Sequence, residues 1–187
     1  IVDILKAFLT LFKGRRRYMP CEEQQAMRLA ILIVVGSVPT AIIGFGFEDF
    51  FESLFSSVLF VGGALLVTGA LLWLTERVRR GSRNINQMGV LDALIIGTMQ
   101  GLAIMPGISR SGSTICTSLL LGLNRETATR YSFLLSIPAV FGASLFKLKD
   151  MLEMVGQGFP WVMLVTATLA AVVAGIVAIL LVVQLLK

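Results

Sequence analysis

The stretch Gln100-Gly-Leu-Ala-Ile-Met-Pro-Gly-Ile-Ser-Arg-Ser-Gly-Ser-Thr114 decides how the rest of the chain is interpreted. It places one arginine, four hydroxyl side chains, glycines and a proline between long apolar runs. A charged side chain at membrane depth costs at least a few kcal/mol, so it normally faces a partner or a water-filled cavity. Arg110 is therefore the first candidate functional residue of the chain.

The composition is typical of an integral membrane protein. The 187 residues are 56% hydrophobic and 14% charged, with a mean hydropathy of +0.88, whereas soluble domains average about 25% charged residues. The net charge of +5 comes from short basic clusters between apolar runs, a pattern that sets membrane orientation and does not indicate nucleic-acid binding. The sequence contains no histidine, which excludes histidine-based catalysis and histidine-ligated metals within it. Cys21 and Cys116 lack CxxC spacing and are expected to be free thiols.

Four apolar runs are long enough to cross about 30 Å of hydrocarbon. They cover residues 27–47, 56–74, 131–148 and 161–186. An acidic turn at 48–52, with phenylalanines around it, predicts a short amphipathic segment between the first two runs, and residues 1–12 predict an interfacial helix. Basic blocks at 13–17 and 77–83 lie at the other ends of these runs, so the positive-inside rule places them in the cytoplasm.

The region around the polar stretch does not fit a further simple crossing. Residues 90–105 are apolar but interrupted by polar side chains, and residues 115–123 reach only about 14 Å as a helix. We therefore predict two half-helices that enter from the cytoplasm, turn at residues 106–112 and return. The alternative is one kinked span over residues 90–123, which would place the arginines that follow it outside the cell.

The predicted fold is all-α. It is a polytopic membrane helix bundle with a re-entrant helix-turn-helix hairpin, forming a single transmembrane domain over residues 1–187. Gly97 and Gly101, four residues apart, would let another helix approach the first half-helix closely.

The hairpin tip is predicted to be an anion site. The N-terminus of the return helix, expected near Ser113, offers N–H groups and the positive end of a helix dipole. Arg110 adds a planar fork of donors that matches a phosphate. The other members supply hydroxyls or let the backbone come close, and they are Ser109, Ser111, Thr114, Gly107 and Gly112. In so apolar a chain we expect the phosphate to belong to a lipid.

Structural explanations stay open for two of these residues. Arg110 could pair with a buried carboxylate such as Asp92, and Thr114 could cap the return helix. A P-loop is rejected, because position 113 is serine where the lysine would stand and no strand is expected before it.

The polar stretch and a second one, Tyr131-Ser-Phe-Leu-Leu-Ser-Ile-Pro-Ala-Val-Phe-Gly-Ala143, together resemble the bacterial undecaprenyl-diphosphate phosphatase family, which is linked to bacitracin resistance. The resemblance implies two inverted repeats, each with a re-entrant hairpin. It implies a multi-pass enzyme of the bacterial plasma membrane that removes the terminal phosphate of undecaprenyl diphosphate with a divalent cation, Mg or Ca. It also implies a first repeat before Ile1 and a last helix after Lys187, so we expect a fragment that is inactive alone.

The resemblance also implies roles for the site residues. Arg110 would bind the diphosphate and stabilise charge on the transferred phosphoryl group. Ser109 and Thr114 would hold phosphate oxygens, and Gln100 would orient the tip or a metal-bound water. Substrate contacts are also expected from Gly107, Ser111, Gly112 and Ser113. No metal ligand is nominated.

The expected partners are a polyprenyl diphosphate lipid and the membrane, without nucleic acid, and the oligomeric state stays open between monomer and homodimer. One rival function is a lipid-phosphate transporter or flippase, because carriers also hold anions at broken helices near the midplane. Another is a purely structural membrane subunit. A histidine-dependent lipid phosphatase is disfavoured by the motif and by the lack of histidine.

Overall fold

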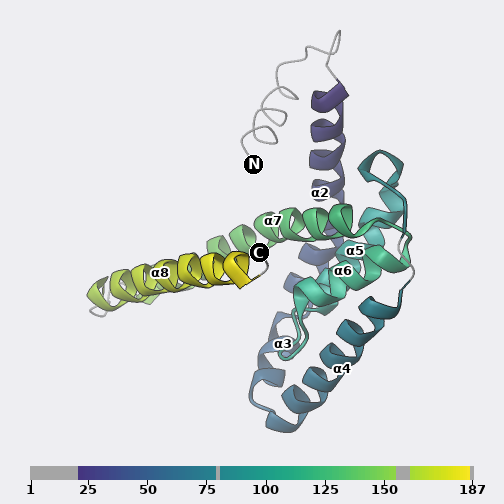
Figure 1. Ribbon diagram of the computed structural model, residues 1–187. Coiled ribbons are helices and arrows are strands. Elements are labelled where there is room, and N and C mark those ends of the chain that lie inside the picture. The colour runs from purple at the N-terminus through teal and green to yellow at the C-terminus, as the bar shows by residue number, and fades with distance from the viewer. Residues whose placement is uncertain (1–20, 79–80, 155–160, 186–187) are drawn as a thin grey trace. The chain divides into compact units, whose positions relative to one another are not determined.

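The computed structural model describes residues 21–78, 81–154 and 161–185, and within these ranges it is helical, with no named strand (Figure 1). The elements in chain order are α2 (Cys21–Gly46), α3 (Glu48–Phe55), α4 (Val58–Arg77), the short 3-10 helix η1 (Ile85–Gln87), α5 (Val90–Leu102), α6 (Arg110–Leu120), α7 (Arg125–Met154) and α8 (Trp161–Leu185). The all-α prediction is confirmed. The predicted interfacial helix at residues 1–12 lies outside the described residues.

Three helices are long and apolar enough to cross a membrane, at Gln24–Gly46, Val58–Arg77 and Trp161–Ala178. They coincide with three of the four predicted crossings. The fourth, residues 131–148, lies within the 30-residue helix α7 and stays a prediction, because its end reaches residues whose side chains are not described.

The chain divides into two compact units, Ile1–Gly142 and Ala143–Lys187. The second unit contains the end of α7 and the helix α8, which is apolar on all sides, with a mean hydropathy of 2.3 over Trp161–Ala178. Such a helix is typical of a lipid-facing span. All site residues considered below belong to the first unit.

Within the first unit, α2 crosses α5 at very close range. A Cβ added to Gly97 would lie 1.9 Å from the Gly36 carbonyl oxygen, and one added to Gly101 would lie 2.8 Å from Ile43 Cδ1. The prediction that these two glycines admit a neighbouring helix is therefore confirmed. Thr40 strengthens the crossing, because its hydroxyl donates to the Gly97 carbonyl at 2.8 Å.

A single apolar core holds α2, α5, α6 and the first half of α7 together. The buried Tyr131 of α7 donates its hydroxyl proton to the Leu32 carbonyl of α2 at 2.8 Å. The other core members include Leu29, Met88, Ala93, Ile96, Leu119, Leu123 and Leu135.

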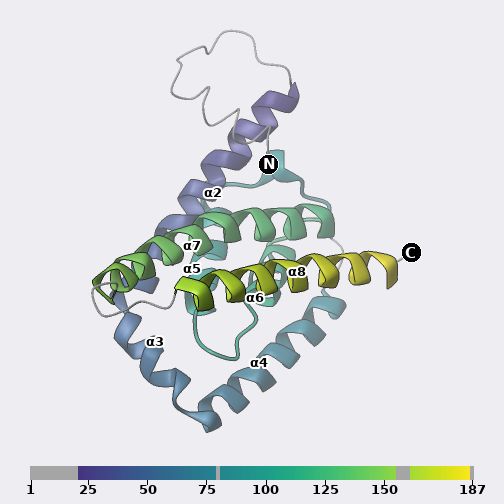
Figure 2. The same cartoon turned by 90° about the vertical axis from the view of Figure 1, so that its left-hand side faces the viewer.

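The acidic turn forms α3, a helix of eight residues that connects α2 to α4. Phe51 on its inner side is buried, whereas Phe50 and Phe55 are exposed. The predicted short amphipathic segment is therefore confirmed. α3 and α4 meet at a sharp corner, and α4 then runs beside α6 (Figures 1 and 2).

The helices α5 and α6 form a hairpin. With 13 and 11 residues they are about 20 and 17 Å long, too short to cross a bilayer. The start and the end of the hairpin are joined, because the Arg83 N–H donates to the Gly122 carbonyl at 3.1 Å and the Asn124 N–H donates to the Arg83 carbonyl at 3.0 Å. The chain thus leaves the hairpin at the end where it entered. The predicted hairpin is confirmed, and the alternative of one kinked span is wrong.

Candidate functional site

The tip of the hairpin is a tight turn over residues 103–109, after which α6 begins at Arg110. The predicted helix start near Ser113 is therefore wrong by about one turn. The cause is Ser109, which caps the helix: its Oγ accepts from the Gly112 N–H at 3.1 Å, and its carbonyl accepts from the Ser113 N–H at 2.9 Å. The alternative in which Thr114 is the cap is also wrong.

Two glycines of the tip are needed for close approach. Gly107 has φ +90°, and a Cβ there would lie 2.7 Å from the Val61 carbonyl oxygen of α4. A Cβ at Gly112 would lie 3.0 Å from Ser109 Oγ. Both therefore let the tip pack against protein. Their predicted approach to a phosphate stays a prediction.

Thr68 of α4 holds the tip in place. Its hydroxyl donates to the Gly107 carbonyl at 2.8 Å and accepts from the Ser109 N–H at 2.9 Å. Both bonds reach residues about 40 positions away, so they fix the turn onto α4. Sequence reasoning missed this residue, because a threonine in an apolar helix usually bonds to its own helix.

Arg110 is the first residue of α6 and is half-buried. Its guanidinium makes no hydrogen bond or ion pair with any residue in the described part of the chain. Asp92 binds Arg83 instead, at 2.6 Å. The structural alternative in which Arg110 pairs with Asp92 is therefore wrong. Arg110 lies at the positive end of α6, where an anion is favoured.

The hydroxyls that follow Arg110 fall into two groups. Ser111 is exposed beside it, whereas Ser113 and Thr114 are almost fully buried one turn further along. Ser113 Oγ donates to the Ser109 carbonyl at 2.9 Å, and Thr114 Oγ1 lies 2.9 Å from the Arg110 carbonyl and 2.5 Å from Ser132 Oγ of α7. The structure therefore gathers Ser109, Arg110 and Ser111 at the start of α6, where all three are at least partly exposed. Phosphate contacts by Ser113 and Thr114 stay a prediction.

Gln100 lies near the end of α5 and is 1% exposed. Its Nε2 makes two long hydrogen bonds, to Thr40 Oγ1 at 3.4 Å and to the Leu135 carbonyl at 3.3 Å. Its Oε1 is buried and has no hydrogen-bond partner among the described residues. Such an acceptor is costly unless water or a ligand group satisfies it. The orienting role of Gln100 stays a prediction.

A divalent cation requires several oxygen ligands at one point. Among the residues that the structure describes, no three Asp, Glu, Cys or His side chains lie close enough to hold one. The carboxylate of the hairpin, Asp92, forms an ion pair with Arg83. The described residues therefore do not fit a metal site on their own.

These features define a class: a polytopic helical membrane protein whose helix hairpin carries an arginine and hydroxyls at its tip. The chain belongs to the family described as bacitracin resistance protein BacA, whose family model matches residues 1–187. It is 51% identical over 164 residues to an undecaprenyl-diphosphatase of Alkaliphilus metalliredigens, covering 87% of this chain and 59% of the relative.

Two further relatives carry the same name. The protein of Halothermothrix orenii is 52% identical over 151 residues, which are 81% of this chain and 58% of the relative. The protein of Methanothermobacter thermautotrophicus is 48% identical over 159 residues, which are 83% of this chain and 87% of the relative. The chain thus spans less than two thirds of the length of the first two relatives.

Proposed function

We propose that the protein containing this chain hydrolyses undecaprenyl diphosphate to undecaprenyl phosphate and inorganic phosphate in the plasma membrane. The observation that carries the proposal is the half-buried Arg110 at the N-terminus of α6, to which no described residue is bonded. The relatives' name, undecaprenyl-diphosphatase, supports the same substrate. The product is the monophosphate carrier that cell-wall synthesis uses again.

Hydrolysis adds water across the phosphoanhydride, so the bond between the terminal phosphorus and the bridging oxygen breaks. Arg110 would bind two phosphate oxygens with its planar fork and offset the charge that builds on them. The Arg110 and Ser111 N–H groups have no acceptor in the described part of the chain, so they could donate to the same phosphate. Ser109 and Ser111 would add hydroxyl donors.

Four residues of the site would act indirectly, by holding the parts of the hairpin in place. Thr68 and Gly107 fix the turn, and Thr114 joins α6 to α7 through Ser132. Gln100, which makes two long hydrogen bonds to residues of α2 and α7, would orient the tip. The family resemblance implies a divalent cation, Mg or Ca. The described residues do not supply its ligands.

The test is phosphate release from undecaprenyl diphosphate by the purified complete protein in detergent. Arg110→Ala is expected to lower kcat/KM by about 100- to 1000-fold, the usual loss when one donor to a developing anion is removed. Arg77→Ala is the matched control, because Arg77 is another arginine of the same unit and stacks on Trp73 at 4.2 Å.

Two outcomes would contradict the proposal. If Arg110→Ala kept full activity, the arginine would be a structural residue. If the wild-type protein moved the lipid across vesicle membranes without releasing phosphate, the protein would be a carrier.

A further inference from the structure

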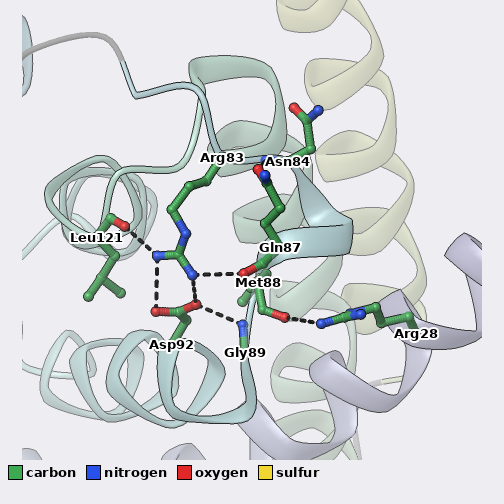
Figure 3. Close-up of polar contacts among 8 residues, drawn as sticks. All are labelled: Arg28, Arg83, Asn84, Gln87, Met88, Gly89, Asp92 and Leu121. Carbon is green, nitrogen blue, oxygen red and sulfur yellow. Dashed lines mark hydrogen bonds and ion pairs between the residues drawn. The ribbon is translucent and has the colours of Figure 1, made fainter.

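The end of the hairpin opposite the tip is closed by one arginine (Figure 3). The Arg83 guanidinium donates to Asp92 Oδ2 at 2.6 Å and to Oδ1 at 3.4 Å. It also donates to the Leu121 carbonyl at 2.6 Å and to the Gln87 carbonyl at 2.8 Å. One side chain therefore contacts the start of α5, the end of α6 and the segment that leads into the hairpin.

The backbone at the same point is joined as tightly. Arg83 exchanges both of its main-chain hydrogen bonds with the segment after α6, and the side chains of Asn84 and Asn124 are hydrogen-bonded beside it. A Cβ at Gly81 would lie 2.2 Å from the Gly122 carbonyl oxygen, so only glycine fits there. The segment that enters the hairpin thus lies directly against the segment that leaves it.

The charges suit the helix ends that they touch. Asp92 lies in the first turn of α5 and accepts from the Gly89 N–H at 2.7 Å, so a carboxylate meets the positive end of one helix. Arg83 binds the Leu121 carbonyl, so a cation meets the negative end of the other. The ion pair therefore joins the first turn of α5 to the C-terminal end of α6.

Stability alone does not explain this arrangement. The Arg83 side chain is 36% exposed and Asp92 is largely buried, and an ion pair is weak evidence for stability whether it is exposed or buried. What the contacts do supply is geometry. A planar guanidinium that binds three acceptors from different segments sets how far α6 is displaced along its axis relative to α5.

We propose that Arg83 and Asp92 are positioning residues that place Arg110 on the diphosphate. This inference rests on the proposed function. α6 is a rod of 11 residues, about 17 Å long, with Arg110 at one end and its C-terminal carbonyls against Arg83 at the other. A shift at the base therefore moves the guanidinium at the tip, and a misplacement of about 1 Å can cost about 100-fold in rate.

A double-mutant cycle on phosphate release by the complete protein tests this. Arg83→Met is expected to lower kcat/KM by about 10- to 100-fold in the wild-type background. In an Arg110→Ala background, measured in single turnovers, it should change the rate by less than about twofold, because nothing is left to position. If Arg83 acted independently of Arg110, the same fold-loss would appear in both backgrounds, and the inference would be overturned.

Three variants separate geometry from charge. Asp92→Ala removes the acceptor for Arg83 and for the Gly89 N–H, so its activity should fall as in Arg83→Met, and wild-type activity would contradict the inference. Arg83→Lys keeps the charge without the fork, so it should fall between wild type and Arg83→Met. Full activity in Arg83→Lys would contradict the inference. Arg77→Met, which removes an arginine stacked on Trp73, should be fully active.

A readout that does not depend on activity separates this inference from the proposed function. Spin labels on Leu91 and Leu120, both exposed at the base of the hairpin, report the distance between the start of α5 and the end of α6. In a Cys21→Ser background, Arg83→Met should broaden or shift this distance. An unchanged distance would overturn the positioning role even if the wild-type protein released no phosphate.

Discussion

The Asp92 carboxylate binds the Arg83 guanidinium at 2.6 Å, at the end of the hairpin away from its tip. Asp92 is the buried carboxylate that could have paired with Arg110. It binds Arg83 instead. Of the two arginines of this region, Arg83 is therefore fixed by protein acceptors, whereas Arg110 binds no residue in the described ranges. This difference is what makes the tip a candidate anion site.

Thr68→Val is expected to loosen the tip. The change removes the bonds to the Gly107 carbonyl and from the Ser109 N–H, and leaving such groups without partners costs about 1–3 kcal/mol. We expect slower phosphate release and a lower Tm. Thr75→Val is the matched control on the same helix, because among the described residues the Thr75 hydroxyl bonds only to Leu71 of its own helix. Equal behaviour of the two variants would show that the contact to the tip has no effect.

Gly97→Ala is expected to disrupt the crossing of α2 and α5. The new Cβ would overlap the Gly36 carbonyl, and overpacking of this kind typically costs about 1–3 kcal/mol or more. The Tm in detergent should fall clearly. Gly69→Ala on α4 is the control, since a Cβ there meets no described atom within 4 Å. A normal Tm for Gly97→Ala would mean that the two helices do not cross at this point.

Gln100→Leu distinguishes a bracing residue from one that contacts substrate or water. Its two hydrogen bonds are long and its Oε1 has no partner among the described residues, so replacing the amide should change the Tm little. If the amide orients the tip or a water, phosphate release should nevertheless fall. Loss of Tm and activity in parallel would assign Gln100 a bracing role only.

Thr114→Val is expected to weaken the joint between α6 and α7. The hydroxyl is fully buried and lies 2.5 Å from Ser132 Oγ, so its loss leaves buried polar groups unpaired at about 1–3 kcal/mol. Thr114→Ser keeps the hydroxyl and should restore most of the Tm. If Thr114→Val had a normal Tm but a raised KM, the threonine hydroxyl would contact substrate instead of joining the two helices.

Much of the fold follows from local sequence. Long apolar runs predict α2, α4 and α8, and the brevity of residues 115–123 predicts a hairpin, because helix length and bilayer thickness are fixed quantities. The small residues Gly97 and Gly101 also indicate a close helix crossing without any knowledge of the partner.

The details of the site depend on contacts between distant residues, which a sequence pattern does not contain. Thr68 meets Ser109 from 41 positions away, and Arg83 reaches Leu121 from 38 positions away. The predicted helix start is misplaced for a local reason, because three other hydroxyl residues, Ser111, Ser113 and Thr114, compete with Ser109 for the cap. Only the fold decides which of them stands at the first turn.

The most direct test of the central claim is the binding of a non-hydrolysable polyprenyl methylene-diphosphonate to the complete protein, measured for the wild type and for Arg110→Ala. If the Arg110 guanidinium meets the lipid diphosphate, the Kd should rise at least about tenfold, which corresponds to about 1.4 kcal/mol, whereas Arg77→Ala should leave it unchanged. An equal Kd for Arg110→Ala and the wild type would contradict the account.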